Sequence, residues 1–465
     1  MGALGWLDVA RTDEEEAALG GQDNRLDPTP GTTEDLTPSP EAVAPLVPAE
    51  VIAQTLPEYL SAQWLRIRGG DIGMIPVIVG LVLIAIVFEI ISPDHVFLHA
   101  GNIVNLFQQS AVFMVLAMAE IFVLLLGELD LSIGYWGAVA GVIAVQLVQP
   151  VTTDWPWIPA ILVALLAVAL IGGLQGTIIT RLRVPAFVVT LAGALIGNGV
   201  MLIVLGFGPF SGYPSLTGRT ANLHALHDLM WSTVSPLLGW IILAIVVAFI
   251  GFRLISRDVR RRRSGLVAPP PSVTYIKVGL VAAGGAAVVA ICNINRAAIG
   301  TLEGVPYVIF IVLGVFAGWT FLLGRTRYGR YVYAIGGNAE AARRAGINVN
   351  MVRTFGFVLC LVTAGVAGIL YASYLGGMSN NFPGGQYVLY AVGAAVIGGT
   401  SLFGGRGKIA HGLLGGLVIG GIYNGMYLLA LAVQWQFIVT GLVLIAAVVI
   451  DSLSRRAGAG GASGR

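Results

Sequence analysis

The chain has 465 residues, of which 56% are hydrophobic and only 11% charged, with a formal net charge of +2. A soluble domain carries about 25% charged residues, so this chain has too few to cover a surface that faces water. The composition therefore excludes a soluble globular protein and predicts an all-α polytopic membrane protein. The net charge gives no indication of nucleic-acid binding, because the basic residues lie in loops.

Residues 1–70 form a region distinct from the rest of the chain. Its first half is rich in acids, Pro, Thr and Gly, and it lacks a periodic apolar face. This composition predicts a disordered cytoplasmic tail. The basic start and apolar core of a signal peptide are both missing. A short amphipathic piece near 59–68 is expected to lie on the membrane surface before the first span.

Apolar segments long enough to cross a bilayer begin at residue 73, each needing roughly 20 residues. They predict about twelve transmembrane helices, in a domain over 71–453 that is followed by a cytoplasmic tail over 454–465. The segments lie at 73–92, 103–126, 135–149, 157–180, 186–205, 236–256, 275–295, 305–324, 352–376, 387–403, 409–430 and 434–450.

The distribution of basic residues predicts the orientation. Lysine and arginine occur in the loops at 181–185, 257–274, 325–351 and 404–408, and in the tail from 454. The alternate loops, such as 207–235, are nearly free of them. Short basic loops stay on the cytoplasmic side, so both termini are expected to be cytoplasmic.

The first interruption of the apolar sequence is GELDLSIG at 127–134, with Glu120 about two helical turns earlier. Acids at membrane depth are costly and usually face a cavity or a partner. Glycines at both ends suit a broken helix, which is tolerated only where the backbone is buried in protein or lines water. A cytoplasmic turn, in which Asp130 and Ser132 cap the next helix, explains the same residues equally well.

The loop over 325–351 is the longest hydrophilic interruption in the second half of the chain. Against one acid, Glu340, it carries five arginines: Arg325, Arg327, Arg330, Arg343 and Arg344. A solvated turn between two spans would account for this charge by itself. The order of the residues indicates more than a connector.

The middle of this loop is patterned as a short helix in water. Gly336 and Gly337 are expected to break the chain, Asn338 is a good N-cap, and 339–345 are helix formers. Gly346 would then end the helix. The acid stands in the first turn and two arginines in the last, as the helix dipole favours. Its alanines, at 341, 342 and 345, would let another protein approach closely.

Other features argue against chemistry in this chain. The glycine-rich segment 397–408 contains no GxxxxGK[ST] loop, so we reject a nucleotide site there. Cys292 and Cys360 fall in apolar segments and are interpreted as buried free thiols without a redox or metal role.

Glycine pairs spaced by four residues predict close helix packing: 137/141, 172/176, 193/197, 416/420 and 421/425. The scarcity of ionisable residues in the spans argues against a proton-coupled secondary transporter, although about twelve spans is common in that class.

Three stretches carry a resemblance to a known family: ELDLSIG at 128–134, RYGRYVYAIGGNAEAARRAGINV at 327–349, and AVIGGTSLFGGRGKIAHGLLGGLVIGG at 395–421 followed by NGMYLL. The chain resembles the permease subunit of bacterial ABC importers for monosaccharides, the ribose, xylose and galactose group, over roughly 75–452. Glu128 before Leu-Asp, and an inserted helix pair around 257–272, are most similar to the xylose type. Tyr387 and Tyr390 stand in a segment where relatives usually carry an acid.

The resemblance implies a type II-like importer permease in the bacterial inner membrane, with no catalytic residue, metal or cofactor of its own. A cytoplasmic ATPase subunit would hydrolyse ATP, and an extracytoplasmic binding protein would deliver the sugar, with xylose favoured. A second copy of this chain would complete the path through the surrounding lipid. The segment 338–346 would be the helix that couples to the ATPase, through Asn338, Glu340, Ala341, Arg343, Arg344 and Gly346. The translocation path would be lined by Glu120, Glu128, Asp130, Ser132 and Gly134.

Overall fold

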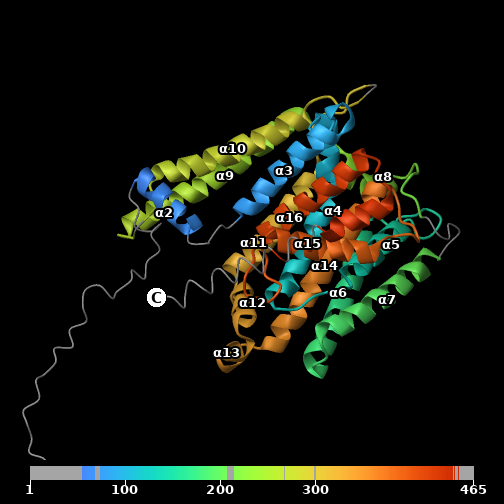
Figure 1. The fold of residues 1–465 in the computed structure, drawn as a ribbon. Coiled ribbons are helices and arrows are strands. Elements are labelled where there is room, and N and C mark those ends of the chain that lie inside the picture. The colour runs from blue at the N-terminus through green and yellow to red at the C-terminus, as the bar shows by residue number, and fades with distance from the viewer. Residues whose placement is uncertain are drawn as a thin grey trace, which may run out of the picture. The chain divides into compact units, whose positions relative to one another are not determined.

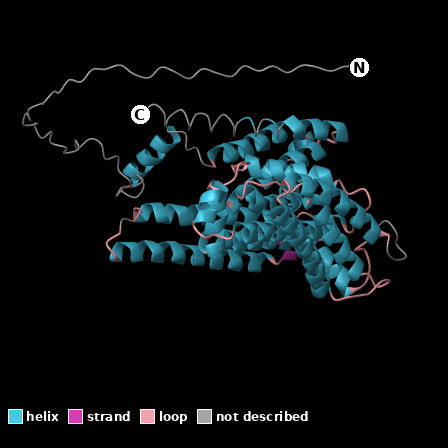
Figure 2. Cartoon of the chain, turned by 90° about the horizontal axis from the view of Figure 1, so that it is seen from below, coloured by secondary structure: helices cyan, strands magenta, loops and turns pink. Residues whose placement is uncertain are grey.

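A computed structural model describes residues 55–68, 74–206, 214–266, 268–297 and 300–442, with 445 and 449. Most of the predicted N-terminal tail and the whole of 454–465 lie outside the described residues. The described part is almost entirely helical, and its only sheet is a two-residue antiparallel pairing (Figure 2). The amphipathic piece near 59–68 is helical, as part of the slightly longer α2, Leu56–Arg68, and its position on the membrane surface stays a prediction.

The elements follow the predicted segments closely. After α2 they are α3 Ile75–Ile91, the 3-10 turn η1 Pro93–His95, α4 Ala100–Leu125, α5 Ile133–Leu147, α6 Trp157–Leu182, α7 Ala186–Leu205, α8 Ala221–Trp231, β1 Thr233–Val234, α9 Pro236–Arg263, α10 Pro271–Cys292, β2 Val305–Pro306, α11 Tyr307–Arg325, α12 Arg327–Gly337, α13 Ala339–Arg344, α14 Val349–Leu375, α15 Gly384–Ile397 and α16 Ile409–Leu428 (Figure 1).

Eight of the described helices are long and apolar enough to cross a membrane: α4, α6, α7, α9, α10, α11, α14 and α16. Three shorter apolar helices, α3, α5 and α15, occupy further predicted segments. The last predicted segment, 434–450, is helical over 433–442, and most of its remainder lies outside the described residues. The count of about twelve spans and the cytoplasmic position of both termini stay predictions.

The helix α4 is the centre of the packing. Every residue in its most apolar 18-residue window is buried, against 11% for α9 and for α10. It packs against α14, α15 and α16, and α14 packs in turn against α5 and α6. A helix surrounded by others on all sides must be apolar all round, and the run 111–125 of α4 is interrupted by one ionisable residue, Glu120.

Small residues let these helices approach one another, as the glycine pairs predict. A Cβ on Gly137 would lie 2.7 Å from the carbonyl oxygen of Ala364 in α14, and one on Gly141 would lie 2.6 Å from that of Gly368. On α6, a Cβ on Gly176 would lie 2.7 Å from Cα of Thr354. These contacts bring backbones together where no hydrophobic effect between helices drives association.

The sequence predicted that the basic run 260–263 would lie in a loop. It lies instead in the last turn of α9. Arginine is a good helix former, and positive charge in a last turn is favoured by the helix dipole. The adjacent α10 begins at Pro271, where proline's missing N–H costs nothing. Asp258 of α9 connects the two helices, because its Oδ2 accepts a hydrogen bond of 2.5 Å from Oγ1 of Thr274 in α10.

The C-terminal end of α14 is hydrogen-bonded to α8, a helix that was not predicted from the sequence. Ser373 Oγ donates to the carbonyl of His227 at 2.9 Å and accepts from the N–H of Met230 at 3.1 Å. Trp231 donates through Nε1 to the carbonyl of Tyr374 at 3.2 Å, and the two rings stack with centroids 5.6 Å apart. These bonds fix α8 on the end of α14.

Candidate functional site

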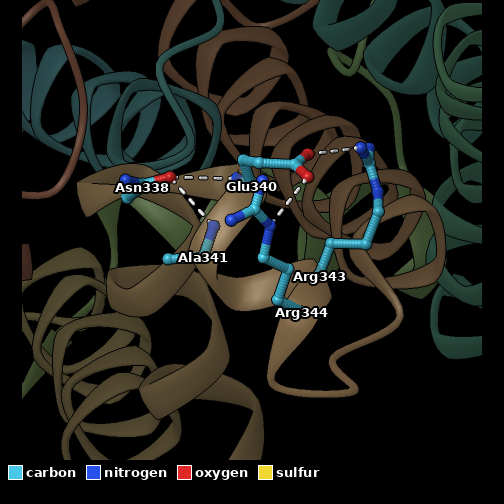
Figure 3. A network of polar contacts seen from close by, with 5 residues as sticks. All are labelled: Asn338, Glu340, Ala341, Arg343 and Arg344. Carbon is cyan, nitrogen blue, oxygen red and sulfur yellow. Dashed lines mark hydrogen bonds and ion pairs between the residues drawn. The ribbon is translucent and has the colours of Figure 1, made fainter.

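The predicted short helix of the long basic loop is present as α13. The Asn338 side chain caps it by accepting hydrogen bonds from the N–H groups of Glu340 and Ala341, at 3.1 and 3.0 Å (Figure 3). The chain then turns at Gly346, whose φ is +81°. The N–H of Ile347 closes the turn on the carbonyl of Ala342 at 3.1 Å, in the pattern of a Schellman motif. Asn338 therefore caps the start of the helix and Gly346 ends it, as the sequence predicted.

The charges of α13 are paired with each other. The Glu340 carboxylate accepts from Nη1 of Arg343 at 3.0 Å and from Nε of Arg344 at 3.3 Å (Figure 3). All six residues predicted to couple this helix to a partner are exposed: Asn338, Glu340, Ala341, Arg343, Arg344 and Gly346. Ala342, one of the alanines expected to face a partner, is instead buried against the rest of the chain. The outward face of α13 is thus small and polar.

Gly336 and Gly337 do not break the chain, contrary to the sequence-based expectation. The helix α12 includes both and ends at Gly337, with Asn338 as its C-cap and with Val332 and Ile335 buried. Glycine is tolerated here because the two residues form only the last turn, where few helical bonds follow. Helix α12 is therefore a second element of the basic loop, and it connects α11 to α13.

Gly336 lies where three distant parts of the chain meet, a contact that we call the glycine junction. It comprises Gly336, Gly404 and Gly405 together with Leu125 and Gly127. A Cβ on Gly336 would overlap the carbonyl oxygen of Leu125, the last residue of α4. That carbonyl also accepts the N–H of Gly405 at 2.9 Å. The end of α12 is therefore packed, backbone against backbone, on both the break after α4 and the loop before α16.

A side chain reinforces this contact. Tyr333 of α12 donates through its hydroxyl to the carbonyl of Gly407 at 2.9 Å. The glycine-rich loop itself needs its glycines, because Gly404 and Gly405 have φ of +84° and +71°, where other residues are disfavoured. This loop, rejected above as a nucleotide site, has a clear packing role.

The break between α4 and α5 covers 126–132, as the predicted broken helix requires. Its polar groups bind one another. Glu120 Oε1 accepts from the N–H of Asp130 at 3.2 Å, while Asp130 Oδ1 accepts from the N–H and the hydroxyl of Ser132, at 2.8 and 2.5 Å. All three residues have 0% exposure. Glu120 Oε2 and Asp130 Oδ2 have no hydrogen-bond partner.

The burial of Asp130 and Ser132 bears on the two interpretations of 127–134. An exposed turn would leave Asp130 and Ser132 in water, and they are fully buried. Neither side chain caps the first turn of α5, because Asp130 binds the N–H of Ser132 itself. Asp130 and Ser132 are therefore buried in protein, whereas Gly127 is exposed and Glu128 is partly buried. This burial favours the broken helix over the exposed turn.

The remaining two residues of the predicted path have other contacts. Glu128 is mostly buried and forms an ion pair of 3.4 Å with Arg353 of α14. Gly134 lies where α5 touches α15, and a Cβ on it would overlap the carbonyl oxygen of Gly384. The structure thus brings Glu120, Asp130 and Ser132 into one cluster and places Gly134 at a helix contact. Their role in a path between two copies stays a prediction.

Sequence reasoning missed a buried amide network on the same central helices. Asn102 of α4 and Asn424 of α16 bind each other through their side chains, at 2.9 and 3.1 Å. Gln109 accepts from Asn424 at 3.0 Å and donates to the hydroxyl of Tyr374 at 3.0 Å. Amide side chains within apolar helices were the available signal, since such groups need partners in a bilayer.

The family description that matches this chain is "Branched-chain amino acid transport system / permease component", over residues 102–448. The chain belongs to this permease family. The matched range runs from the first turn of α4 to beyond α16, so it contains the break, the glycine junction and α13. With the eight long apolar helices, this makes the chain a multi-pass membrane permease.

Named relatives cover nearly the whole permease. This chain is 32% identical over 382 residues to a xylose transport system permease protein of Escherichia coli (strain K12). The match covers 82% of this chain and 92% of the relative. A ribose import permease protein of the same organism is 30% identical over 394 residues, 85% of this chain and 96% of the relative. A xylose permease of Haemophilus influenzae is 32% identical over 385 residues, 81% and 96% of the two chains. No solved structure matches the permease.

Proposed function

We propose that this permease is the membrane subunit of an ATP-driven importer for a pentose of the xylose or ribose kind. The observation that carries the proposal is the position of α13. This capped, charged helix is exposed, and the preceding helix is packed on the break between α4 and α5. The names of the relatives support a pentose as the substrate.

In this function, a cytoplasmic ATPase subunit docks on α13. The exposed side chains of Arg343, Arg344 and Ala341 provide a polar face with room for a close partner. Movement of the ATPase displaces α13 and the attached α12. Because Gly336 has no free space toward Leu125, the displacement reaches the break at 126–132 rather than being absorbed by side chains.

Two copies of the permease enclose the path, and an extracytoplasmic binding protein supplies the sugar. Glu120, Asp130 and Ser132 hold the break in its shape, and Glu128 connects it to α14. Opening toward either side of the membrane follows from rigid-body movement of packed helices, a hinge or shear transition.

Ion-coupled secondary transport is the second candidate. One observation favours it: the buried carboxyl groups of Glu120 and Asp130 each keep one oxygen without a hydrogen-bond partner. Buried ionisable groups of this kind form proton relays in pumps and transporters. The relay would need further titratable groups along a path, and Glu120 is the sole acid or base in the buried run 111–125 of α4.

The test is uptake into proteoliposomes that contain the purified permease, with or without the ATPase subunit and the binding protein. We expect uptake of labelled xylose or ribose only with all three proteins and ATP, and unaffected by a protonophore. Uptake by the permease alone, driven by an imposed proton gradient, would establish the second candidate instead. The permease alone is expected to show no ATP hydrolysis above a mock purification, because its sequence has no Walker-type loop.

A further inference from the structure

A cavity of about 440 Å³ opens between the end of α6 and the start of α14. It belongs neither to the break nor to the glycine junction. Its wall combines polar and apolar side chains, chiefly Thr177, Arg181, Asn350, Met351, Phe355 and Val358. A space of this size, with one cation and several amide and hydroxyl groups, is suited to a charged ligand that also has an apolar part.

The packing of the two helices explains why the cavity forms there. Deeper in the bundle, Gly176 brings α6 within contact of Thr354, and the hydroxyls of Thr180 and Thr354 lie 3.2 Å apart. Thr180 and Thr354 themselves line the cavity, which extends along both helices from this contact. The α6 helix ends at Leu182, and Arg183 turns the chain with a φ of +56°.

The polar side of the cavity has unused donors. Among the described residues, no acid forms an ion pair with Arg181, and the side-chain nitrogens of Asn348 and Asn350 donate to no acceptor. Guanidinium and amide groups placed together favour an anionic ligand with several acceptor oxygens. Such a ligand is a phosphate group.

The apolar side of the cavity is continuous with an exposed apolar face of α6. Leu170 and Leu174 of α6 are 67% and 57% exposed, and Met351 and Phe355 at the cavity are 71% and 43% exposed. Arg181 stands in the last turn of this 26-residue apolar helix, where a span reaches the headgroup layer. Basic pockets between transmembrane helices on the cytoplasmic side are typical binding places for anionic headgroups.

We propose that this cavity binds one anionic phospholipid. Its phosphate lies against Arg181, with Asn348 and Asn350 as further donors, and an acyl chain covers Phe355, Met351 and the apolar face of α6. Because α14 follows α13 after four residues, 345–348, the bound lipid also stabilises the segment that connects the two helices. The proposal requires that α6 spans the membrane, and it is independent of the transported substrate.

The test measures retained and rebound phospholipid on the purified full-length permease by native mass spectrometry. We expect one phosphatidylglycerol to bind more tightly than phosphatidylcholine. Arg181→Gln should weaken phosphatidylglycerol binding about fivefold, the effect of removing one basic residue at the headgroup layer. The matched control is Arg183→Gln, because Arg183 is exposed two residues away and does not line the cavity. Gel filtration of both variants confirms that they fold.

Two further arms separate the lipid from other sources of phosphate. Phe355→Ser should weaken phosphatidylglycerol binding. Inorganic phosphate at millimolar concentration should not compete with phosphatidylglycerol for the permease. Competition by inorganic phosphate, with no effect of Phe355→Ser, would show a simple anion site and overturn the proposal. Equal loss in the Arg181 and Arg183 variants would overturn it as well. The proposal would also be overturned if the ATPase subunit, and not lipid, protected Met351 from oxidation. That result would assign the cavity to the protein partner.

Discussion

Glu128 Oε1 lies 3.4 Å from Nη1 of Arg353, and this ion pair joins the break after α4 to the start of α14. The side chains are 13% and 29% exposed, so the pair is only partly screened by solvent. Helix α14 follows α13 after a short turn. Besides the glycine junction, the pair therefore connects the break to the helix that follows the basic loop.

We expect Glu128→Gln and Arg353→Gln each to lower uptake, and the double variant to be no worse than the poorer single one. A double-mutant cycle on thermal unfolding in detergent should give a coupling energy of about 1 kcal/mol, typical of residues in direct contact. Strict additivity of the two single changes would show that the ion pair contributes nothing.

The glycine junction predicts a sharp difference between two adjacent glycines. Gly336→Ala should greatly reduce uptake and lower the melting temperature, because its Cβ would overlap the carbonyl oxygen of Leu125. Gly337→Ala is the matched control, since a Cβ at that position meets nothing within 4 Å. Both glycines lie in the last turn of α12, so helix propensity changes equally in the two variants. Similar behaviour of the two variants would contradict the packing argument.

For α13, Gly346→Val should abolish co-purification of the ATPase subunit and uptake while the permease stays folded. The φ of +81° disfavours a β-branched residue, although a Cβ there meets open space, so the effect is backbone strain alone. Gly346→Asn is the control, because asparagine tolerates this conformation. Glu340→Lys should weaken the association by removing both internal ion pairs and reversing charge at the helix N-terminus. Normal association in both Gly346→Val and Glu340→Lys would make this loop a plain connector.

At the break, Asp130→Ala should lower the unfolding free energy by about 2 kcal/mol, because it leaves the buried N–H of Ser132 without an acceptor. The hydroxyl of Ser132 keeps only its longer contact of 3.3 Å with Gln175 Oε1. We expect it also to abolish uptake while the ATPase subunit still binds at α13. Asp130→Asn keeps an acceptor oxygen and should retain most of the stability. Normal uptake by Asp130→Ala would remove any role of this residue beyond folding.

The buried carboxyl of Glu120 offers a test between the two candidate functions. Glu120→Gln keeps an acceptor for the N–H of Asp130, so stability and ATP-driven uptake should stay near wild type. Glu120→Leu removes the acceptor and should cost about 1–3 kcal/mol. A stable Glu120→Gln variant without uptake would show that an ionisable group is needed there, which favours ion coupling.

Local signals in the sequence predicted the local structure well. Asn338 and Gly346 mark the ends of α13 because capping depends on residues within one turn of the chain. The apolar segments likewise predicted the positions of the helices, since a bilayer-length apolar run has few alternatives. The arginines of α9 were misplaced because charge was taken as a sign of a loop, and arginine forms helices readily.

Contacts between distant segments were not predictable from one sequence. Gly336 is needed because Leu125, more than 200 residues earlier, places a carbonyl oxygen beside it. Nothing next to Gly336 in the chain reveals that neighbour, so the glycine was interpreted as a break. The same holds for Glu128 and Arg353, whose charges were visible in the sequence and whose proximity depends on the packing of α4 on α14.

Helix α14 has 27 residues, so it is a continuous rod of about 40 Å. One end follows α13 and bears Arg353, and the other holds α8 through Ser373 and Tyr374. Because α14 is continuous, we expect a tilt at its first turn to displace α8 at the far end as well as the break, to which Arg353 joins it. By the reciprocity of such coupling, we expect a binding protein that docks at the far end of α14 to bias the position of α13 before any sugar has moved.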